Sequence, residues 1–393
     1  MAEVAAAAPQ VDEPDWLSAR RDEAKRASAD LELPDQKAKG WEFTDLSGLD
    51  LDSFTDGLAA VGGLEATDGD GPVVMPLAEA AVTHSELVRE HLGSLVPDDD
   101  PFVARNASRW RDGVLVYVPA GRQLAQPLQL DIEAAAGEET TWRVLVVVEE
   151  GAEAEVWERY HSQGDGLFNG VIELIVGDNA TLRYVCEQEL SDSSWVFATQ
   201  RAEIGRDANL EWTALGFGAA RGKVRMETKL AGRGSSARVT GAMAGAGTQH
   251  LDYDTTQEHV GDHTSSDLAF RGVLTDKATS VWRGMIKVDR GAHQTDAFQE
   301  SRNLLLSHDA HADAIPGLEI EADDVRCTHA AAVAQMDPEQ LYYLKARGLS
   351  EAAAQQLVVE GFVGELVERA PKGPAREELA ERLEARMVEL LTA

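Results

Sequence analysis

The sequence predicts a mainly β protein, with a parallel β-helix core flanked by helical N-terminal and C-terminal regions. Short β-rich runs broken by Gly, Asp and Asn begin at Gly113, and a Gly-led unit recurs about every 27 residues. Helix start and stop signals gather before and after these runs. We therefore divide the chain into a helical and irregular region (1–110), a β-helix core (111–325) and a C-terminal helical domain (326–393).

The recurring unit is a turn followed by a strand. It spans 151–156, 177–182 and 205–210, with a looser copy from Gly232, and the starts lie 26, 28 and 27 residues apart. A stacked solenoid requires such a period, because each rung buries its apolar face only against its neighbours. A β-sandwich built from hairpins could also place turns this often. We favour the β-helix, and the spacing alone leaves the sandwich open.

The N-terminal region carries two candidate helices. One covers residues 15–30, and the other ends at Leu92 with Ser85 as its expected cap. The acidic, Pro-flanked stretch 97–101 predicts a loop. Between the helices lies the aromatic run WEFTDL (41–46), which we interpret as an anchor that packs this region onto the rest.

The C-terminal region predicts three amphipathic helices. Asp337 is an expected N-cap with Pro338 at the first helical position, and Gly348 suits the left-handed residue after the last turn. A second helix opens at Ser350 and ends before Pro371, and a third starts at Ala375. Their apolar stripes must be buried on each other, on the solenoid or on a partner.

Composition narrows the class of protein. The 393 residues carry 69 acidic and 36 basic side chains, a net charge of −33 that would repel nucleic acids and anionic membranes. Only 9 of the basic residues are Lys and 27 are Arg, a pattern typical of halophile proteins, although an ordinary acidic protein remains the alternative. No apolar run is long enough to span a bilayer, and the acidic start lacks a basic signal-sequence region. We expect a cytoplasmic protein that binds neither nucleic acid nor membrane.

Standard enzyme motifs are absent from the sequence. The stretch from Gly218 to Val224 approaches a phosphate-binding loop, but it is one residue short and lacks the Ser or Thr that holds magnesium. His308 and His311, with Asp309 and Asp313, could bind a divalent metal if a turn gathered them. Solvated side chains on solenoid turns are the simpler interpretation.

The pair Cys327 and His329 is a stronger candidate site. Residues two apart on a strand point to the same face, and thiolate and imidazole both suit iron, zinc or sulfur chemistry. A nearby imidazole can favour the thiolate. Two ligands cannot complete an iron–sulfur site, so further ligands would have to come from another chain. A buried Cys beside a hydrogen-bonded His is the alternative, and Cys186 is expected to be a buried core thiol.

Several longer runs carry a family resemblance. They are SRNLLLS (301–307), PGLEI (316–320), DVRCTHAAAV (324–333) and DPEQLYYLKARG (337–348), supported upstream by the rungs and by the 41–46 run. Together they resemble the SufB/SufD family of iron–sulfur cluster assembly proteins. Within that family the chain looks like the SufD type, because it is short and has Ala330 where the SufB paralogue typically has Glu.

The resemblance implies a right-handed parallel β-helix and a role as a non-catalytic scaffold. It implies a hetero-oligomer with a SufB-like chain and two copies of SufC, an ABC-type ATPase. No cofactor would be bound stably by the chain alone. A transient iron–sulfur cluster, or iron, would be shared with the SufB-like partner at His329, with Cys327 as a helper.

The same resemblance assigns the C-terminal helices to docking of the ATPase. The residues that we expect there are Leu341, Tyr342, Tyr343, Arg347 and Phe362. Two other functions stay open from the sequence: an exported β-helix enzyme acting on acidic polysaccharide, and a metal-binding solenoid that acts alone through His308, His311 and Asp313.

Overall fold

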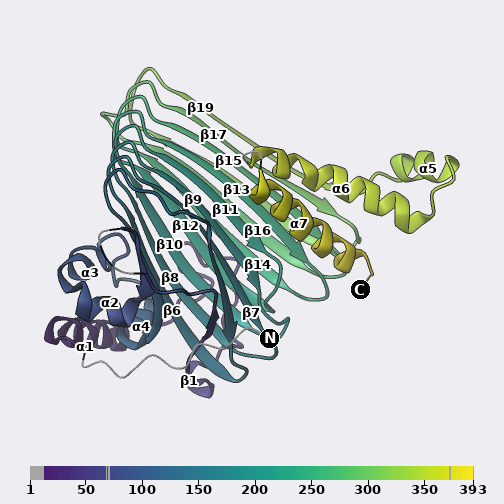
Figure 1. Cartoon of the computed structure of the whole chain (residues 1–393). Helices are drawn as coiled ribbons and strands as arrows, with labels where there is room; N and C mark the ends of the chain where they lie inside the picture. Colours follow the sequence, from purple (N-terminus) through teal and green to yellow (C-terminus); the bar gives the residue numbers. More distant parts are fainter. Residues whose placement is uncertain (1–12, 68, 70, 371–372, 393) are drawn as a thin grey trace.

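The computed structural model describes residues 13–67, 69, 71–370 and 373–392. It is a parallel β-solenoid with helices at both ends of the chain (Figure 1). The predicted fold class is therefore confirmed. Residues 1–12 lie outside the described residues. They make up most of the acidic start, in which the sequence shows no basic signal-sequence region.

Two sheets form the walls of the solenoid within the described chain. Sheet A contains β3 (Val73–Pro76), β4 (Asp112–Val118), β6 (Glu138–Val148), β8 (Leu167–Val176), β10 (Trp195–Ile204), β12 (Arg221–Leu230), β14 (His250–His259), β16 (Thr279–Val288) and β18 (His311–Ile320), with β1 (Thr55–Gly57) beside β6. Sheet B contains β2 (Ala60–Gly62), β5 (Leu128–Ala134), β7 (Glu153–Ser162), β9 (Thr181–Glu189), β11 (Asn209–Gly216), β13 (Ser236–Gly245), β15 (Ser265–Leu274), β17 (Asp296–Leu305) and β19 (Arg326–Gln335).

From β4 onward, each strand pairs in parallel with the second strand after it, so successive strands alternate between the sheets. One strand from each sheet makes one rung. This connectivity excludes a sandwich of hairpins, whose consecutive strands would pair antiparallel. The predicted boundary at 325 is wrong for the sheet, because β19 continues to Gln335 and the helical region starts at Pro338.

The repeated turn explains the period that the sequence shows. Asn179 and Asp207 both adopt a left-handed backbone, with φ of 56° and 54°, a conformation that Asn and Asp tolerate better than most residues. The Asn179 N–H donates to the Arg206 carbonyl of the next rung at 2.7 Å, and the Asp207 N–H donates to Arg233 at 2.9 Å. Each turn is thus bonded to the equivalent turn above it.

The space between the sheets is a continuous apolar core. Alternate side chains of every strand point inward, among them Trp142, Trp212 and Trp282, each at most 1% exposed. Glycine makes room for large rings at some positions. A Cβ at Gly241 would lie only 2.3 Å from Phe270, so the ring fills the volume that a larger residue would occupy.

The N-terminal region covers the outer face of sheet A. Its helices are α1 (Asp15–Asp30), α2 (Leu77–Thr83), α3 (Ser85–His91) and α4 (Pro101–Arg109), with a short 3₁₀ turn η1 (Leu51–Ser53) (Figure 1). The predicted cap at Ser85 is wrong, because Ser85 is already helical and its hydroxyl accepts from Trp16 Nε1. α4 is held by Arg105, which pairs with the buried Glu139 at 2.6 Å.

The 41–46 run acts as the predicted anchor, and we call it the N-terminal strap. Trp41 is buried and stacks on Phe102 at 5.5 Å between ring centres, close to Phe197 at 6.1 Å. Further along the strap, Thr44 is fully buried and Glu42 accepts from Arg283 of β16. The strap therefore ties the N-terminal region to several rungs of sheet A.

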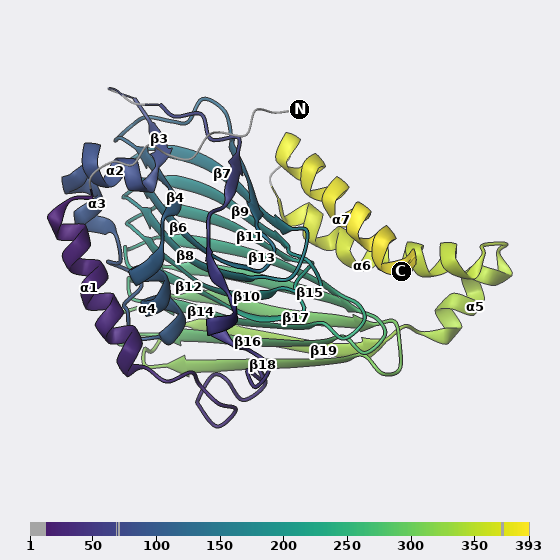
Figure 2. The same ribbon diagram turned by 90° about the horizontal axis from the view of Figure 1, so that it is seen from below.

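The C-terminal helices are α5 (Pro338–Ala346), α6 (Glu351–Arg369) and α7 (Pro374–Thr392). The Asp337 and Ser350 side chains cap α5 and α6 as predicted. α6 and α7 form a hairpin on the outer face of sheet B, opposite the N-terminal helices, whereas α5 projects away from the solenoid (Figure 2). No described helix is long and apolar enough to cross a membrane.

Candidate functional site at the open end of the solenoid

The solenoid ends on an open rung made of β18 and β19. Each is the last strand of its sheet, paired on one side only within the described chain. Both strands have ten residues, and Ile315, Leu318, Ile320 and Val333 are exposed on them. Long exposed edge strands with apolar side chains are templates for strand pairing, which folded proteins normally cover.

The sequence-predicted pair lies on this open rung. His329 is in register with Gln299 of β17, at the end of an inward-facing column that includes Trp212, Val239 and Leu268. Cys327 occupies the same face two residues earlier, as its spacing predicted. Both side chains therefore belong to the row that faces the solenoid interior, at the rung where that interior opens.

The two side chains differ in exposure. Cys327 is half-buried and packs against the cluster that contains Ile286, Val288 and Ala297. His329 is exposed and forms no hydrogen bond or ion pair within the described part of the chain. The alternative of a buried Cys beside a hydrogen-bonded His therefore does not describe this pair.

The thiolate form of Cys327 is disfavoured in this structure. Burial raises the pKa of the Cys327 thiol, and the nearby Asp296 carboxylate raises it further. The thiol is the stable form until a metal ion or a cationic group displaces its proton. Cys186 is buried as predicted, and burial raises its pKa to about 12.

The interior behind His329 is polar, which the sequence reasoning missed. Gln299 is fully buried, and its amide Nε2 donates across the solenoid to the carbonyls of Gly284 at 3.3 Å and Gly317 at 3.1 Å. Asn303, on the same strand, donates to Ser301 at 3.4 Å. The sequence does carry a signal for this polar interior: every second position in the middle of β17 is polar, namely Gln299, Ser301 and Asn303.

The rival metal site at His308 and His311 is not assembled. His311 lies 3.2 Å from Asp313, while His308 faces Asp309 at 3.6 Å. Among the residues described, no three His, Cys, Asp or Glu side chains are grouped closely enough to hold a metal ion.

The near-miss phosphate loop is not a loop at all. Gly222 and Lys223 lie inside β12, and Lys223 is buried between Asp252 and Asp254. Its ammonium group is engaged by carboxylates and cannot meet a phosphate. The sequence-based exclusion of an ATPase motif therefore agrees with the geometry.

The residues expected to dock an ATPase fall into two groups. Tyr342 and Tyr343 on α5 are 75% and 56% exposed, and the Arg347 guanidinium lies 4.8 Å from the Tyr343 ring centre. Leu341 is half-buried. Phe362 instead packs against sheet B, 5.9 Å from the Arg271 guanidinium, so it anchors α6 to the solenoid.

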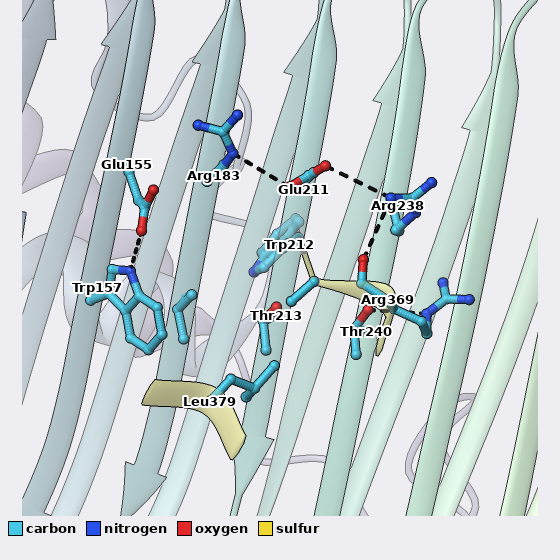
Figure 3. Close-up of a pocket in the computed structure, with 12 residues that line it drawn as sticks. Glu155, Trp157, Arg183, Glu211, Trp212, Thr213, Arg238, Thr240, Arg369 and Leu379 are labelled. Carbon is cyan, nitrogen blue, oxygen red and sulfur yellow. Dashed lines mark hydrogen bonds and ion pairs between the residues drawn. The ribbon is translucent and has the colours of Figure 1, made fainter. Parts of the chain in front are cut away.

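A pocket lies at the seam between sheet B and the α6–α7 hairpin (Figure 3). Arg183 and Arg238 flank Glu211 at 3.5 and 3.8 Å, Trp157 donates to Glu155, and Arg238 reaches the Arg369 carbonyl at 3.5 Å. Arg183 and Arg238 share Glu211, and the third arginine of the lining, Arg369, is paired with Asp267 outside the pocket. The arrangement fixes the hairpin to the sheet.

The open rung, the solenoid and the helices at both ends define the class of protein: a parallel β-solenoid with helical N-terminal and C-terminal regions and an uncovered last rung within the described chain. Residues 132–362 match the family described as the SUF system FeS cluster assembly, SufBD core domain, and residues 63–130 match the SufBD protein N-terminal region. The chain belongs to this SufBD family of iron–sulfur cluster assembly proteins.

Two relatives refine the assignment. The iron–sulfur cluster assembly protein SufD of Bacillus subtilis is 30% identical over 415 residues, covering 95% of each chain. A SufBD family protein of Mycobacterium tuberculosis is 30% identical over 366 residues, covering 90% of this chain and 89% of the relative. Within its family the chain is SufD-like, as its sequence predicted.

Proposed function

We propose that the chain is a non-catalytic scaffold subunit that pairs with a SufB-like chain through its open rung. The observation that carries this proposal is that β18 and β19 end both sheets at the same place and bear exposed apolar side chains. A partner with a matching pair of edge strands would continue both sheets and bury Ile315, Leu318 and Val333. It would also cover the polar interior behind His329.

The shared rung would be the place where the nascent cluster forms. His329 and Cys327 provide at most two of the four donors that a cluster usually takes. The partner would supply the others, and its ligands or the iron itself would displace the Cys327 proton. His329, which is exposed and without a hydrogen bond within the described chain, is the better ligand of the two in the isolated subunit.

The C-terminal helices would dock a SufC-like ABC ATPase. Exposed tyrosines next to an arginine are typical of protein interfaces, and Tyr342, Tyr343 and Arg347 form such a group on the projecting α5. Phe362 would contribute by anchoring α6 to sheet B. An assembly of this kind would work in the cytoplasm.

Affinity purification from the native host tests the proposal. The expected result is that a longer paralogue and an ABC-type ATPase purify with the chain at the salt concentration of the host cytoplasm. Val333→Asp should remove the paralogue but not the ATPase, while Val82→Asp, at an exposed residue of α2, should remove neither. If neither partner is found with the unmodified chain, the proposed function is wrong.

Enzyme and metal assays separate the two rival functions. Lyase or hydrolase activity of the purified chain on acidic polysaccharide would favour a β-helix enzyme. Stoichiometric metal in the isolated chain that His311→Ala removes would favour a solitary metal-binding protein. We expect neither result.

A further inference from the structure

A buried arginine joins the C-terminal helices to the strands beside the candidate site. Arg271 lies on β15 and is only 3% exposed. Its Nη2 donates to Glu300 Oε1 on β17 at 2.6 Å and to Glu365 Oε2 on α6 at 2.9 Å. One guanidinium nitrogen therefore holds a carboxylate from the sheet and a carboxylate from the helix.

The contacts around this bridge form an ion cluster with a buried part, Arg271 and Glu300, and a solvent-exposed part, Arg302 and Glu365. The Phe362 ring of α6 lies 5.9 Å from Arg271 Cζ and shields it from water. Arg302 on β17 adds a second cation, 3.2 Å from Glu300 and 3.9 Å from Glu365. Two arginines and two glutamates balance each other, so displacing α6 would remove one of the two carboxylates that neutralise the buried Arg271 guanidinium.

Glu300 lies beside the candidate site. In the ladder between β17 and β19, Gln299 is the register partner of His329, and Glu300 is the partner of Ala330. The backbone that carries Glu300 is thus bonded to the strand that carries Cys327 and His329. A shift of Glu300 would be transmitted to β19 through ladder hydrogen bonds.

Two arginines of the α6–α7 hairpin also bind the sheet, but at strands other than β17. Arg369 is bound to Asp267 on β15, and Arg382 is bound to Glu187 on β9. Arg302 of β17 also approaches Glu365 of α6, at 3.9 Å, but it is about half exposed, whereas Arg271 is buried and donates hydrogen bonds to both α6 and β17.

We propose that Arg271 and Glu300 are positioning residues that couple α6 to β19. When the bound ATPase displaces α6, the bridge from Arg271 to Glu365 opens, β17 relaxes and the open rung changes its exposure. Opening and closing of this ion cluster is the two-state element that such coupling requires. This inference rests on the proposed function, because the force on α6 comes from the ATPase.

Hydrogen exchange in the assembled complex tests the coupling. The chain is purified with its SufB-like and ATPase partners, and backbone amide exchange of residues 326–335 is measured by mass spectrometry with and without ATP. The test variants are Arg271→Lys, which cannot donate to both carboxylates in the same geometry, and Glu300→Gln. The matched control is Arg382→Lys, which alters a helix–sheet ion pair away from β17.

In the native complex and in Arg382→Lys, ATP should change the exchange of 326–335 by about 5-fold or more. In Arg271→Lys and Glu300→Gln the change should fall to about 2-fold or less, with both partners still bound. An equal ATP response in all four complexes, or no response in the native complex, would overturn the coupling and leave the proposed function standing. A failure of the native chain to bind its partners would instead reject the proposed function.

Discussion

Lys223 Nζ lies 2.9 Å from Asp252 Oδ2 on the neighbouring strand, and both side chains are almost completely buried. Thr44 of the N-terminal strap donates to the same carboxylate oxygen at 2.6 Å. The strap therefore covers an ion pair that would otherwise lie on the outer face of sheet A. Because Thr44 and Asp252 are joined in this way, folding of the N-terminal region is coupled to folding of the rung that contains β14.

Asp252→Asn should lower the free energy of unfolding by about 3–5 kcal/mol, because it leaves the Lys223 charge buried with only Asp254 nearby. Thr44→Val should cost about 1 kcal/mol, since it removes one hydrogen bond. Urea unfolding measures both values. Glu203→Gln, which breaks the more exposed pair with Lys229, is the control and should cost less than about 1 kcal/mol. A cost for Asp252→Asn no larger than this control would contradict the role of the buried pair.

His259 should make stability depend on pH. It is fully buried between Thr264 and Ser266, at 2.7 and 2.9 Å, and burial lowers its pKa to about 4. The unfolded chain therefore takes up the proton first as the pH falls. The contribution of neutral His259 to the free energy of unfolding is complete above about pH 6.5. It is lost as the pH falls towards 4, by about 3 kcal/mol in total.

The free energy of unfolding of His259→Gln should accordingly change less between pH 7 and pH 4.5 than that of the native chain. Urea titrations at the two pH values measure this difference. Equal changes in both proteins would show that His259 does not titrate on unfolding.

Cys327 should react slowly with thiol reagents at neutral pH. In a Cys186→Ala background, the rate of alkylation by iodoacetamide should keep rising above pH 9, because burial and Asp296 raise the pKa of the thiol. Asp296→Asn should shift the profile to lower pH, and Asp323→Asn, in the turn before β19, should not. An alkylation profile with its midpoint near pH 7 in the chain that carries only Cys186→Ala would contradict the raised pKa of Cys327.

The exposed tyrosines of α5 should matter for binding and not for folding. Tyr342→Ala with Tyr343→Ala should weaken ATPase binding by about 30-fold or more without changing the free energy of unfolding. Phe362→Ala should destabilise the chain by about 3 kcal/mol, because its ring packs on the solenoid. Calorimetric titration and urea unfolding separate the two effects, with Leu58→Ala as an exposed control for both.

The rungs could be predicted because their determinants are local. A left-handed residue sets each turn: Asn179 and Asp207 lie two positions after a glycine, whereas in the first copy Gly151 is itself the left-handed residue. The repetition of these short turn sequences is visible in the sequence. The caps at Asp337 and Ser350 are local as well. The anchoring role of Trp41 could be inferred because a conspicuous aromatic run in a polar region must be buried somewhere.

The remaining features depend on contacts between distant residues. Arg271 and Glu365 are 94 positions apart, so nothing in either neighbourhood indicates their bridge. Phe362 shares a helix stripe with residues that could equally have faced a partner. The raised pKa of Cys327 follows first from its burial and then from Asp296 in the adjacent rung, and neither can be seen in the residues around Cys327. The boundary at 325 was placed too early because the Ala-rich strand β19 resembles a helix in composition.

The open rung also bears on how the chain folds. In a solenoid each rung is stabilised by its neighbours, so β18 and β19, with a neighbour on one side only, form the rung with the least support. Fraying should begin there in the isolated subunit, and it would disperse Cys327 and His329 before any other part of the core melts. Under the proposed function, the last rung would be completed and the candidate site formed in a single event, when the proposed partner chain binds.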